Sequence, residues 1–234
     1  MNKKYLEETK LLDYKCNTIQ KLISDRKFNE LDDYNKIKSI YNYVKDEILF
    51  GYNSSDSISS SEVLSDGYGQ CNTKAILLMS LLRGCNIKCR IHGFYIDKKL
   101  QKGAMTNLVY ILSPRKIFHS WIEVFYNDNW YVLEGVILDN KYLNSIKNKF
   151  KDCTGKFIGY GIATNDFQNI DTTWNECNTY IQSDGIVKDL GIYDSPDELF
   201  KEYDQNMSKL KEMFYKNIGR HLMNKNISKL RNKR

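Results

Sequence analysis

The segment from Ala75 to Leu82 limits the possible folds of this chain more than any other. Its residues are apolar except for Ser80, so a helix formed from them has apolar side chains on nearly every side. The segment is much shorter than the roughly 20 residues that a membrane-spanning helix needs. The sequence therefore predicts a helix buried nearly all round in a folded core, and no transmembrane helix.

The composition also indicates a folded domain. Aromatic residues make up 13% of the 234 residues, which is too many core-forming side chains for a disordered chain. Only 2 Pro and 13 Gly are present, and this excludes collagen-like and proline-rich classes and leaves little room for a flexible hinge. The length suits one large domain, so we expect residues 1–234 to form a single domain.

Helical spacing of apolar side chains recurs along the chain. The stripe that runs from Ile37 to Ile48 is the clearest, and Gly51 marks its end. Further helices are expected within 1–26, as a short helix through 64 capped by the polar loop 53–61, over 140–152, and as one long helix or a helix pair over 197–230.

Alternation of apolar and polar residues indicates strands in the middle of the chain. One strand is expected over 89–96, and two stronger ones over 117–126 and 130–138. The residues between the last two are Asn127-Asp128-Asn129, and Asn and Asp tolerate the left-handed conformation that a tight turn needs. These two strands are therefore expected to form a β-hairpin. Residues 97–115 are expected to be a loop with one apolar insert, and residues 153–195 to be irregular with local strands.

A cysteine begins the buried helix. Cys71 directly follows a glycine-bearing turn, where unpaired backbone N–H groups and the helix dipole stabilise a thiolate. The same N–H groups can stabilise an oxyanion when the sulfur attacks a carbonyl, provided that Gly69 and Gln70 keep the turn open. Cys71 is therefore a candidate nucleophile and Gln70 a candidate oxyanion-site residue, with a packed core thiol as the alternative for Cys71.

A histidine and a carboxylate could complete a catalytic group with this cysteine. His119 is one of only three histidines and begins the second predicted strand run. If the hairpin has a two-residue turn, Trp121 pairs with Glu134 across it. Glu134 then lies one diagonal step from His119 on the same sheet face, within reach of its ring. A nucleophile, a base and an orienting acid are the three parts of a thiol-based acyl-transfer triad.

In order along the chain, these segments resemble the motifs of the transglutaminase-like superfamily. The run Gly69–Ala75, with the helix and strand after it, is similar to the Cys motif of that superfamily. The runs His119–Val124 and Trp130–Glu134 are similar to its His and acid motifs. The resemblance covers about residues 35–139. More loosely, Trp174, Thr179–Gln182 and Asp194–Glu198 resemble the C-terminal extension of a bacterial branch.

The resemblance implies an α+β fold with a papain-like transglutaminase core. In such a core the helix that begins at the cysteine packs on an antiparallel sheet. The helical N-terminal segment 1–34 and the C-terminal extension 140–234 would flank the core of about 35–139.

The resemblance also implies roles for individual residues. Its implied catalytic residues are Cys71 as nucleophile, His119 as base and then acid, and Glu134 as orienting acid. The family usually has Asp where this chain has Glu134, and Asp139 is a nearby alternative for the third role. The family often has an aromatic residue just after its cysteine, where this chain has Asn72, so Asn72 bears on substrate preference. Trp121 flanks His119 and is a candidate wall of the site, with a core position as the alternative.

The implied activity is thiol-dependent acyl transfer at an amide or peptide bond, as in a protease, amidase, deamidase or transglutaminase. The superfamily also includes members that have lost catalysis, so the alternative is an inactive module that binds a peptide or nucleic acid. The expected partner is a protein or peptide substrate, or a small amide. No cofactor, no metal and no membrane contact are expected, since no loop carries closely spaced acidic ligands of the kind that bind calcium.

The N-terminal residues and the cysteines bear on the compartment. Glu7 and Glu8 stand where a secretory signal would need its apolar stretch, so we expect a cytoplasmic location with reduced thiols. A zinc site is disfavoured because no tight knuckle joins the cysteines. His92 and His221 belong to no motif and are expected to be structural. The cysteines considered for zinc are Cys85, Cys89, Cys153 and Cys177.

Positive charge is concentrated at the C-terminal end, where residues 211–234 carry eight basic side chains and one acidic one. Such a tail can bind nucleic acid or acidic partners. Lys and Arg in the last turns of a helix also complement the helix dipole, however. We therefore favour a solvated helix end over a nucleic-acid interface.

Overall fold

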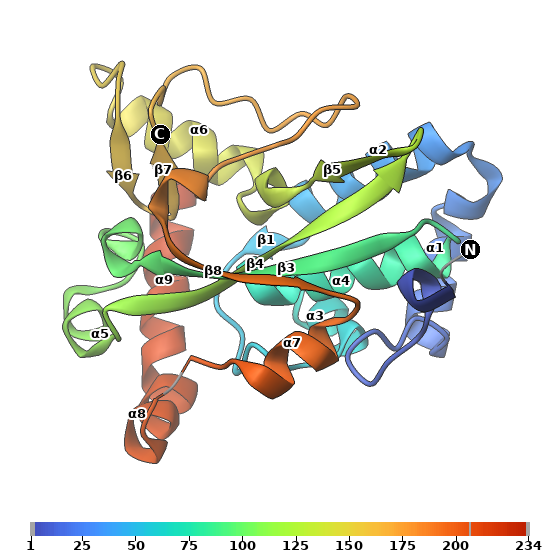
Figure 1. Ribbon diagram of the computed structural model, residues 1–234. Helices are drawn as coiled ribbons and strands as arrows, with labels where there is room; N and C mark the ends of the chain where they lie inside the picture. The colour runs from blue at the N-terminus through green and yellow to red at the C-terminus, as the bar shows by residue number, and fades with distance from the viewer. Residues whose placement is uncertain (1–2, 206, 233–234) are drawn as a thin grey trace.

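The centre of the fold is a four-stranded antiparallel sheet in the order β5-β4-β3-β8, seen across the middle of the computed structural model in Figure 1. The structure describes residues 3–205 and 207–232. The strands of this sheet are β3 (Cys89–Asp97), β4 (Lys116–Tyr126), β5 (Asn129–Val132) and β8 (Ile186–Tyr193). The longest pairing joins β3 to β4, from Cys89 opposite Val124 to Asp97 opposite Lys116.

The apolar helix α4 (Cys71–Gly84) packs against β3 and β4. Every side chain from Cys71 to Arg83 is buried, because further helices cover the side of α4 that faces away from the sheet. These helices are α1 (Asn17–Asp25), α2 (Asp33–Asp46) and α3 (Ser60–Asp66). The α+β class, with a cysteine-bearing helix on an antiparallel sheet, is thus confirmed.

Two glycines shape the chain before α4. Gly67 ends α3 in the left-handed conformation with φ 69°, which a residue without a Cβ adopts most easily. Gly69 lies so close to α4 that an added Cβ would stand 2.7 Å from Oγ1 of Thr73. The short parallel pair β1 (Leu49–Phe50) and β2 (Tyr68–Gly69) leads directly from this turn into Cys71.

The rest of the chain surrounds this centre. Its remaining helices are α5 (Asn107–Leu112), α6 (Asn140–Lys149), α7 (Pro196–Glu202), α8 (Lys209–Phe214), the π-helical turn η6 (Tyr215–Gly219) and α9 (Arg220–Arg231). Its remaining strands, β6 (Phe157–Gly159) and β7 (Ile162–Thr164), pair with each other. The short 3₁₀ helices are η1 (Lys3–Leu6), η2 (Phe28–Glu30), η3 (Lys98–Gln101), η4 (Glu134–Ile137) and η5 (Ser183–Gly185).

Several expected elements differ from the observed ones. Of the region 1–26, where a helix was expected, α1 covers only Asn17–Asp25. Leu11 and Leu12 are buried in an irregular segment before α1, where the Leu11 N–H donates to the Asp197 side chain and not to a helical carbonyl. The predicted loop 97–115 contains the helix α5. The local strands expected within 153–195 are confirmed as β6, β7 and β8, although the sequence did not indicate that β8 joins the central sheet. The region 197–230, expected to be one long helix or a helix pair, contains α7 and then α8, η6 and α9 in succession.

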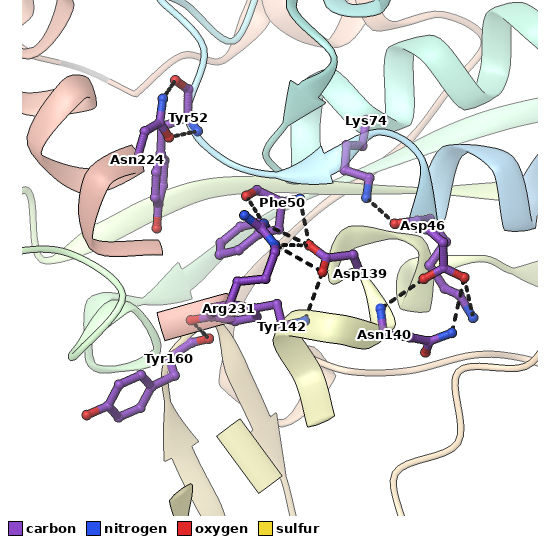
Figure 2. A network of polar contacts seen from close by, with 11 residues as sticks. Asp46, Phe50, Tyr52, Lys74, Asp139, Asn140, Tyr142, Tyr160, Asn224 and Arg231 are labelled. Carbon is purple, nitrogen blue, oxygen red and sulfur yellow. Dashed lines mark hydrogen bonds and ion pairs between the residues drawn. The ribbon is translucent and has the colours of Figure 1, made fainter. Parts of the chain in front are cut away.

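A buried ion pair fixes α9 against the core (Figure 2). Arg231 Nη2 lies 2.8 Å from Oδ2 of Asp139 and donates to the carbonyl of Phe50 at 2.6 Å. Earlier on the same helix, Asn224 Oδ1 accepts a hydrogen bond from the Tyr52 N–H at 2.7 Å, and Asn224 Nδ2 donates to the Tyr52 carbonyl at 3.0 Å. The basic C-terminal helix is therefore anchored at two points beside β1.

Within residues 3–205 and 207–232, no helix is long and apolar enough to cross a membrane.

Candidate functional site

Cys71 is the first residue of α4, at the end of the glycine turn. Gln70 precedes it in an extended conformation, and its backbone N–H donates to Oγ1 of Thr73 at 3.0 Å. The side chain of Cys71 is 8% exposed. Its sulfur thus lies at the positive end of the helix dipole, beside backbone N–H groups that α4 itself does not use.

His119 lies on β4 opposite Phe94 of β3 and is completely buried. Its Nε2 lies 3.0 Å from Oε1 of Glu134. Its other ring nitrogen, Nδ1, has no hydrogen-bond partner among the residues that the structure describes. One nitrogen is therefore held by a carboxylate, and the other is available for proton exchange.

Glu134 is also completely buried and is fixed from two sides. While Oε1 faces His119, Oε2 accepts hydrogen bonds from the backbone N–H groups of Ile181, Gln182 and Ser183, at 2.8, 3.0 and 3.2 Å. These three backbone hydrogen bonds therefore fix the orientation of the Glu134 carboxylate.

The hairpin brings Glu134 to His119 by a different route from the one expected. The two-residue turn and its register are confirmed from Tyr126 opposite Asn129 to Glu123 opposite Val132. The expected strand to residue 138 is wrong, because β5 ends at Val132 and η4 begins at Glu134. Beyond Val132 the chain bonds to Thr179 instead, with Gly135 N–H donating to the Thr179 carbonyl at 3.2 Å. Glu134 therefore approaches His119 from a turn and not from a paired strand position.

Charges around the His119 ring favour its protonated form. Burial lowers its pKa, but the nearby Cys71 and the contact with Glu134 together raise that pKa to about 9. Cys71 is the largest of the influences that raise the pKa. The protonated ring of His119 is thus favoured beside the sulfur of Cys71.

Asn72 connects the start of α4 to the strand that carries His119. Its Oδ1 accepts a hydrogen bond from Ser120 Oγ at 2.8 Å, and its Nδ2 donates to the Phe118 carbonyl at 3.3 Å. Asn72 is fully buried, and its two partners flank His119 in sequence. Its position therefore ties the backbone of Cys71 to that of His119.

Gln70 links α4 to the preceding loop. Its Oε1 accepts from the Asn53 N–H at 2.8 Å, and its Nε2 donates to Oδ1 of Asp56 at 3.0 Å. Burial raises the pKa of Asp56, and hydrogen bonds from Gln70 and Asn72 only partly offset this effect. A carboxyl group with a raised pKa thus lies near the nucleophile, and no sequence motif indicated it.

Trp121 lies on the same face of β4 as His119, but away from Cys71. Its ring centroid is 4.0 Å from that of Phe94 and 6.2 Å from that of His119. Trp121 is 8% exposed, and its indole N–H has no hydrogen-bond partner among the described residues. Trp121 thus packs beside the rings of Phe94 and His119, and both expected roles, a wall of the site and a core position, remain open.

Asp139, the alternative to Glu134, contacts other partners. It caps α6 through the N–H of Tyr142 at 2.8 Å, accepts from the N–H of Phe50 at 3.0 Å and pairs with Arg231. Burial raises its pKa, but the bond to Arg231 and the charge of Arg231 outweigh this and lower it. The Asp139 carboxylate is therefore committed to anchoring α9 and α6, and the Glu134 carboxylate is the one that contacts His119.

Cys71 and Gln70 line a cavity of about 490 Å³. The loop at 54–57 forms one side of this cavity, and side chains of α5, α8, η6 and α9 form the other. The volume is in the usual range of about 300–1,000 Å³ for a ligand site. Space for a substrate thus adjoins the sulfur.

The other thiols differ from Cys71. Burial raises the pKa of Cys85 to about 12 and that of Cys89 to about 11. Both groups are therefore protonated at neutral pH and poor nucleophiles. Within residues 3–205 and 207–232, no cluster of three or more His, Cys, Asp or Glu side chains could hold a metal ion.

Sequence reasoning missed two parts of the site. The backbone N–H groups at 181–183 that hold Glu134 carry no side-chain signal, although Thr179–Gln182 belongs to a segment noted for its resemblance to an extension. Gln101, which accepts a hydrogen bond from Tyr52 at 2.7 Å within the cavity, lies in a segment that the sequence indicated only as a loop.

A comparison with known protein families finds one match. Residues 23–135 match the family described as the transglutaminase-like superfamily. This segment contains Cys71, His119 and Glu134. No curated protein matches the chain significantly.

Two solved structures are similar to this chain. One is a candidate cysteine protease of Cytophaga hutchinsonii, with 14% identity, a TM-score of 0.47, and coverage of 83% of this chain and 47% of that one. The other is the transglutaminase of red sea bream, with 20% identity, a TM-score of 0.31, and coverage of 44% of this chain and 22% of that one. This chain thus spans about half of the first structure and less of the second.

Proposed function

Because residues 23–135 match the transglutaminase-like superfamily, we propose that this chain is a thiol-dependent enzyme that cleaves or transfers an acyl group at an amide bond. The single observation that carries the proposal is the His119 ring. Its Nε2 is held by Glu134, while its Nδ1 is unpaired and its pKa responds to Cys71. This is the arrangement of an imidazole that exchanges a proton with a thiol.

In the proposed reaction, the Cys71 thiolate attacks the carbonyl carbon of the amide. A sulfur–carbon bond forms, and the carbonyl oxygen becomes an oxyanion. Backbone N–H groups at the start of α4 would stabilise this charge. Gln70 supports the turn that presents them through its bonds to Asn53 and Asp56.

His119 then completes the first half of the reaction. Its Nδ1–H donates a proton to the leaving nitrogen, the carbon–nitrogen bond breaks, and an acyl-enzyme remains on Cys71. In the second half, water or an amine attacks the thioester carbon, and His119 Nδ1 accepts its proton. The sulfur–carbon bond then breaks, which returns Cys71 as a thiolate and releases the acyl group as an acid or a new amide. The fixed Glu134 carboxylate keeps the Nε2–H in place throughout, so the ring presents the same nitrogen in both halves.

The test uses a mixture of peptide amides, with mass spectrometry of both released amines and acylated peptides of the protein. The expected result is a covalent acyl adduct on the Cys71 peptide and release of the amine. The Cys71→Ala variant should lose both signals, whereas Cys16→Ala, at a thiol outside the site, should keep them. Undiminished amine release by Cys71→Ala would exclude the proposal.

A further inference from the structure

We infer that the amide on which Cys71 acts carries a bulky, uncharged apolar group next to its carbonyl, an inference that rests on the proposed function. The cavity beside Cys71 has two unlike sides. Serine hydroxyls of the loop at 54–57, the amide of Gln70 and the carboxyl group of Asp56, to which Gln70 Nε2 donates, form the polar side beside Cys71. Apolar side chains form the opposite side.

The apolar side is assembled from segments far apart in the sequence. Its side chains are aliphatic, thioether or aromatic, and none of them can pair with a charged substrate group. The main contributors are Met105, Val109, Phe118, Phe200, Phe214 and Met223. A pocket lined in this way binds a ligand by removing apolar surface from water, so it favours a large apolar group over a polar one.

Half of these six side chains lie outside the segment that matches the superfamily. The match ends at residue 135, whereas Phe200, Phe214 and Met223 come from α7, α8 and α9. Figure 1 shows α8 and α9 on the side of the fold where α5 lies, and α7 below the sheet. The preference therefore depends on the extension together with the matched segment.

Hydrogen bonds hold the extension in place over the cavity. Tyr215 OH donates to the Asn53 carbonyl at 3.0 Å, next to the polar loop. Gln205 bonds to β4 at two points, accepting from the Phe118 N–H at 2.9 Å and donating to the Lys116 carbonyl at 3.1 Å. Since these contacts join the extension to both sides of the site, the cavity has a defined shape before a substrate binds.

The charged groups at the rim of the cavity are occupied with protein partners. Lys211 Nζ donates to the Leu112 carbonyl at 3.1 Å. Lys216 pairs with Glu212 at 2.9 Å, and both of these side chains are about half exposed. These contacts leave no cluster of like charge among the described residues that would select an ionic substrate.

Alkylation of Cys71 measures this preference without a known substrate. The probes are iodoacetamide and N-benzyl iodoacetamide, which both place an amide carbonyl beside the sulfur after iodide is displaced. The measured quantity is the ratio of their rates at Cys71, divided by the same ratio at the partly exposed Cys16. Burial of the benzyl group predicts a preference of about tenfold or more at Cys71.

Two neighbouring residues of α5 provide a matched pair of variants. Leu112 lines the cavity and is 40% exposed, whereas Ile111 is 72% exposed and does not line it. Both positions are open enough to accept a charge without loss of folding. Leu112→Glu should reduce the preference for the benzyl reagent, and Ile111→Glu should leave it unchanged.

The inference is overturned if the ratio at Cys71 equals that at Cys16, or if the two variants behave alike. Failure of the proposed function gives a different result. In that case Cys71 would react slowly and without dependence on His119, while the ratio of the two reagents would still report on the cavity.

Discussion

The Nε2 atom of His119 lies 3.0 Å from Oε1 of Glu134, and both side chains are completely buried. The second oxygen of Glu134 is saturated by three consecutive backbone N–H groups. The carboxylate therefore cannot rotate away without leaving buried donors unpaired. This fixes which ring nitrogen of His119 remains for Cys71.

Glu134→Gln should damage both stability and reactivity. A glutamine amide has only one acceptor oxygen, so its NH₂ group must face either the backbone donors or the His119 Nε2. We expect a loss of about 2–3 kcal/mol in the free energy of unfolding and a fall of about 10²-fold in Cys71 alkylation. Urea unfolding and alkylation rates measure the two effects. The control is Glu30→Gln, at a side chain that is 69% exposed. Equal values for the two variants would contradict the assigned contact.

Asn72 and Ser120 should be energetically coupled. Either alanine variant leaves a buried polar partner unsatisfied, because Ser120 Oγ donates to Asn72 Oδ1 at 2.8 Å. A double-mutant cycle of unfolding free energies should give a coupling of about 1 kcal/mol or more. If the hydrogen bond positions Cys71 relative to His119, Asn72→Ala should also slow the alkylation of Cys71. Additive effects of the two substitutions would contradict this prediction.

The buried amine of Lys74 should make the free energy of unfolding depend on pH between about 7 and 10. Burial lowers its pKa from 10.5 to about 7, while Nζ donates to the Lys45 carbonyl at 3.0 Å. The unfolded chain therefore binds more protons than the folded chain between these two values, and the contribution of Lys74 to stability rises with pH across that window.

Lys74→Met removes this pH dependence. Relative to the wild type, the variant should lose about 1.4 kcal/mol of stability for each pH unit between about 7 and 10. Urea unfolding at several pH values measures the difference. Lys21→Met, at a side chain that is 76% exposed, should differ from the wild type by a constant amount. A constant difference for Lys74→Met as well would contradict the prediction.

Arg231→Ala should destabilise the fold strongly. Asp139 would remain buried without its counter-charge, and the Phe50 carbonyl would lose its side-chain donor (Figure 2). Removal of one partner of a buried ion pair costs about 3–5 kcal/mol. The exposed Lys229→Ala, two residues earlier on α9, should have little effect. Urea midpoints compare the two, and equal midpoints would show that the ion pair does not anchor α9.

The sequence predicted correctly those elements whose residue pattern matches their surroundings in the fold. Apolar residues fill α4, and Asn127 and Asp128 take the positive φ values of 46° and 60° that the hairpin turn requires. The register from Tyr126 to Val132 then followed from the turn alone. The proximity of Glu134 to His119 was also expected from that register, although the strand ends before Glu134.

The parts that could not be predicted depend on contacts between distant segments. β5 ends at Val132 because Thr179, far along the chain, takes over its hydrogen bonds. Leu11 and Leu12 are buried without forming a helix because the side chain of Asp197 bonds to that segment. No periodicity in one segment reports such partners, and the same holds for the backbone donors that fix Glu134.

The most direct test of the account is the rate of Cys71 alkylation by iodoacetamide as a function of pH, in the wild type and in His119→Ala. The account predicts that Cys71 reacts faster than Cys16 and Cys153 near neutral pH, and that this advantage disappears without His119. If Cys71 reacts as slowly as those thiols and is indifferent to His119, the proposed thiolate and imidazolium pair does not exist.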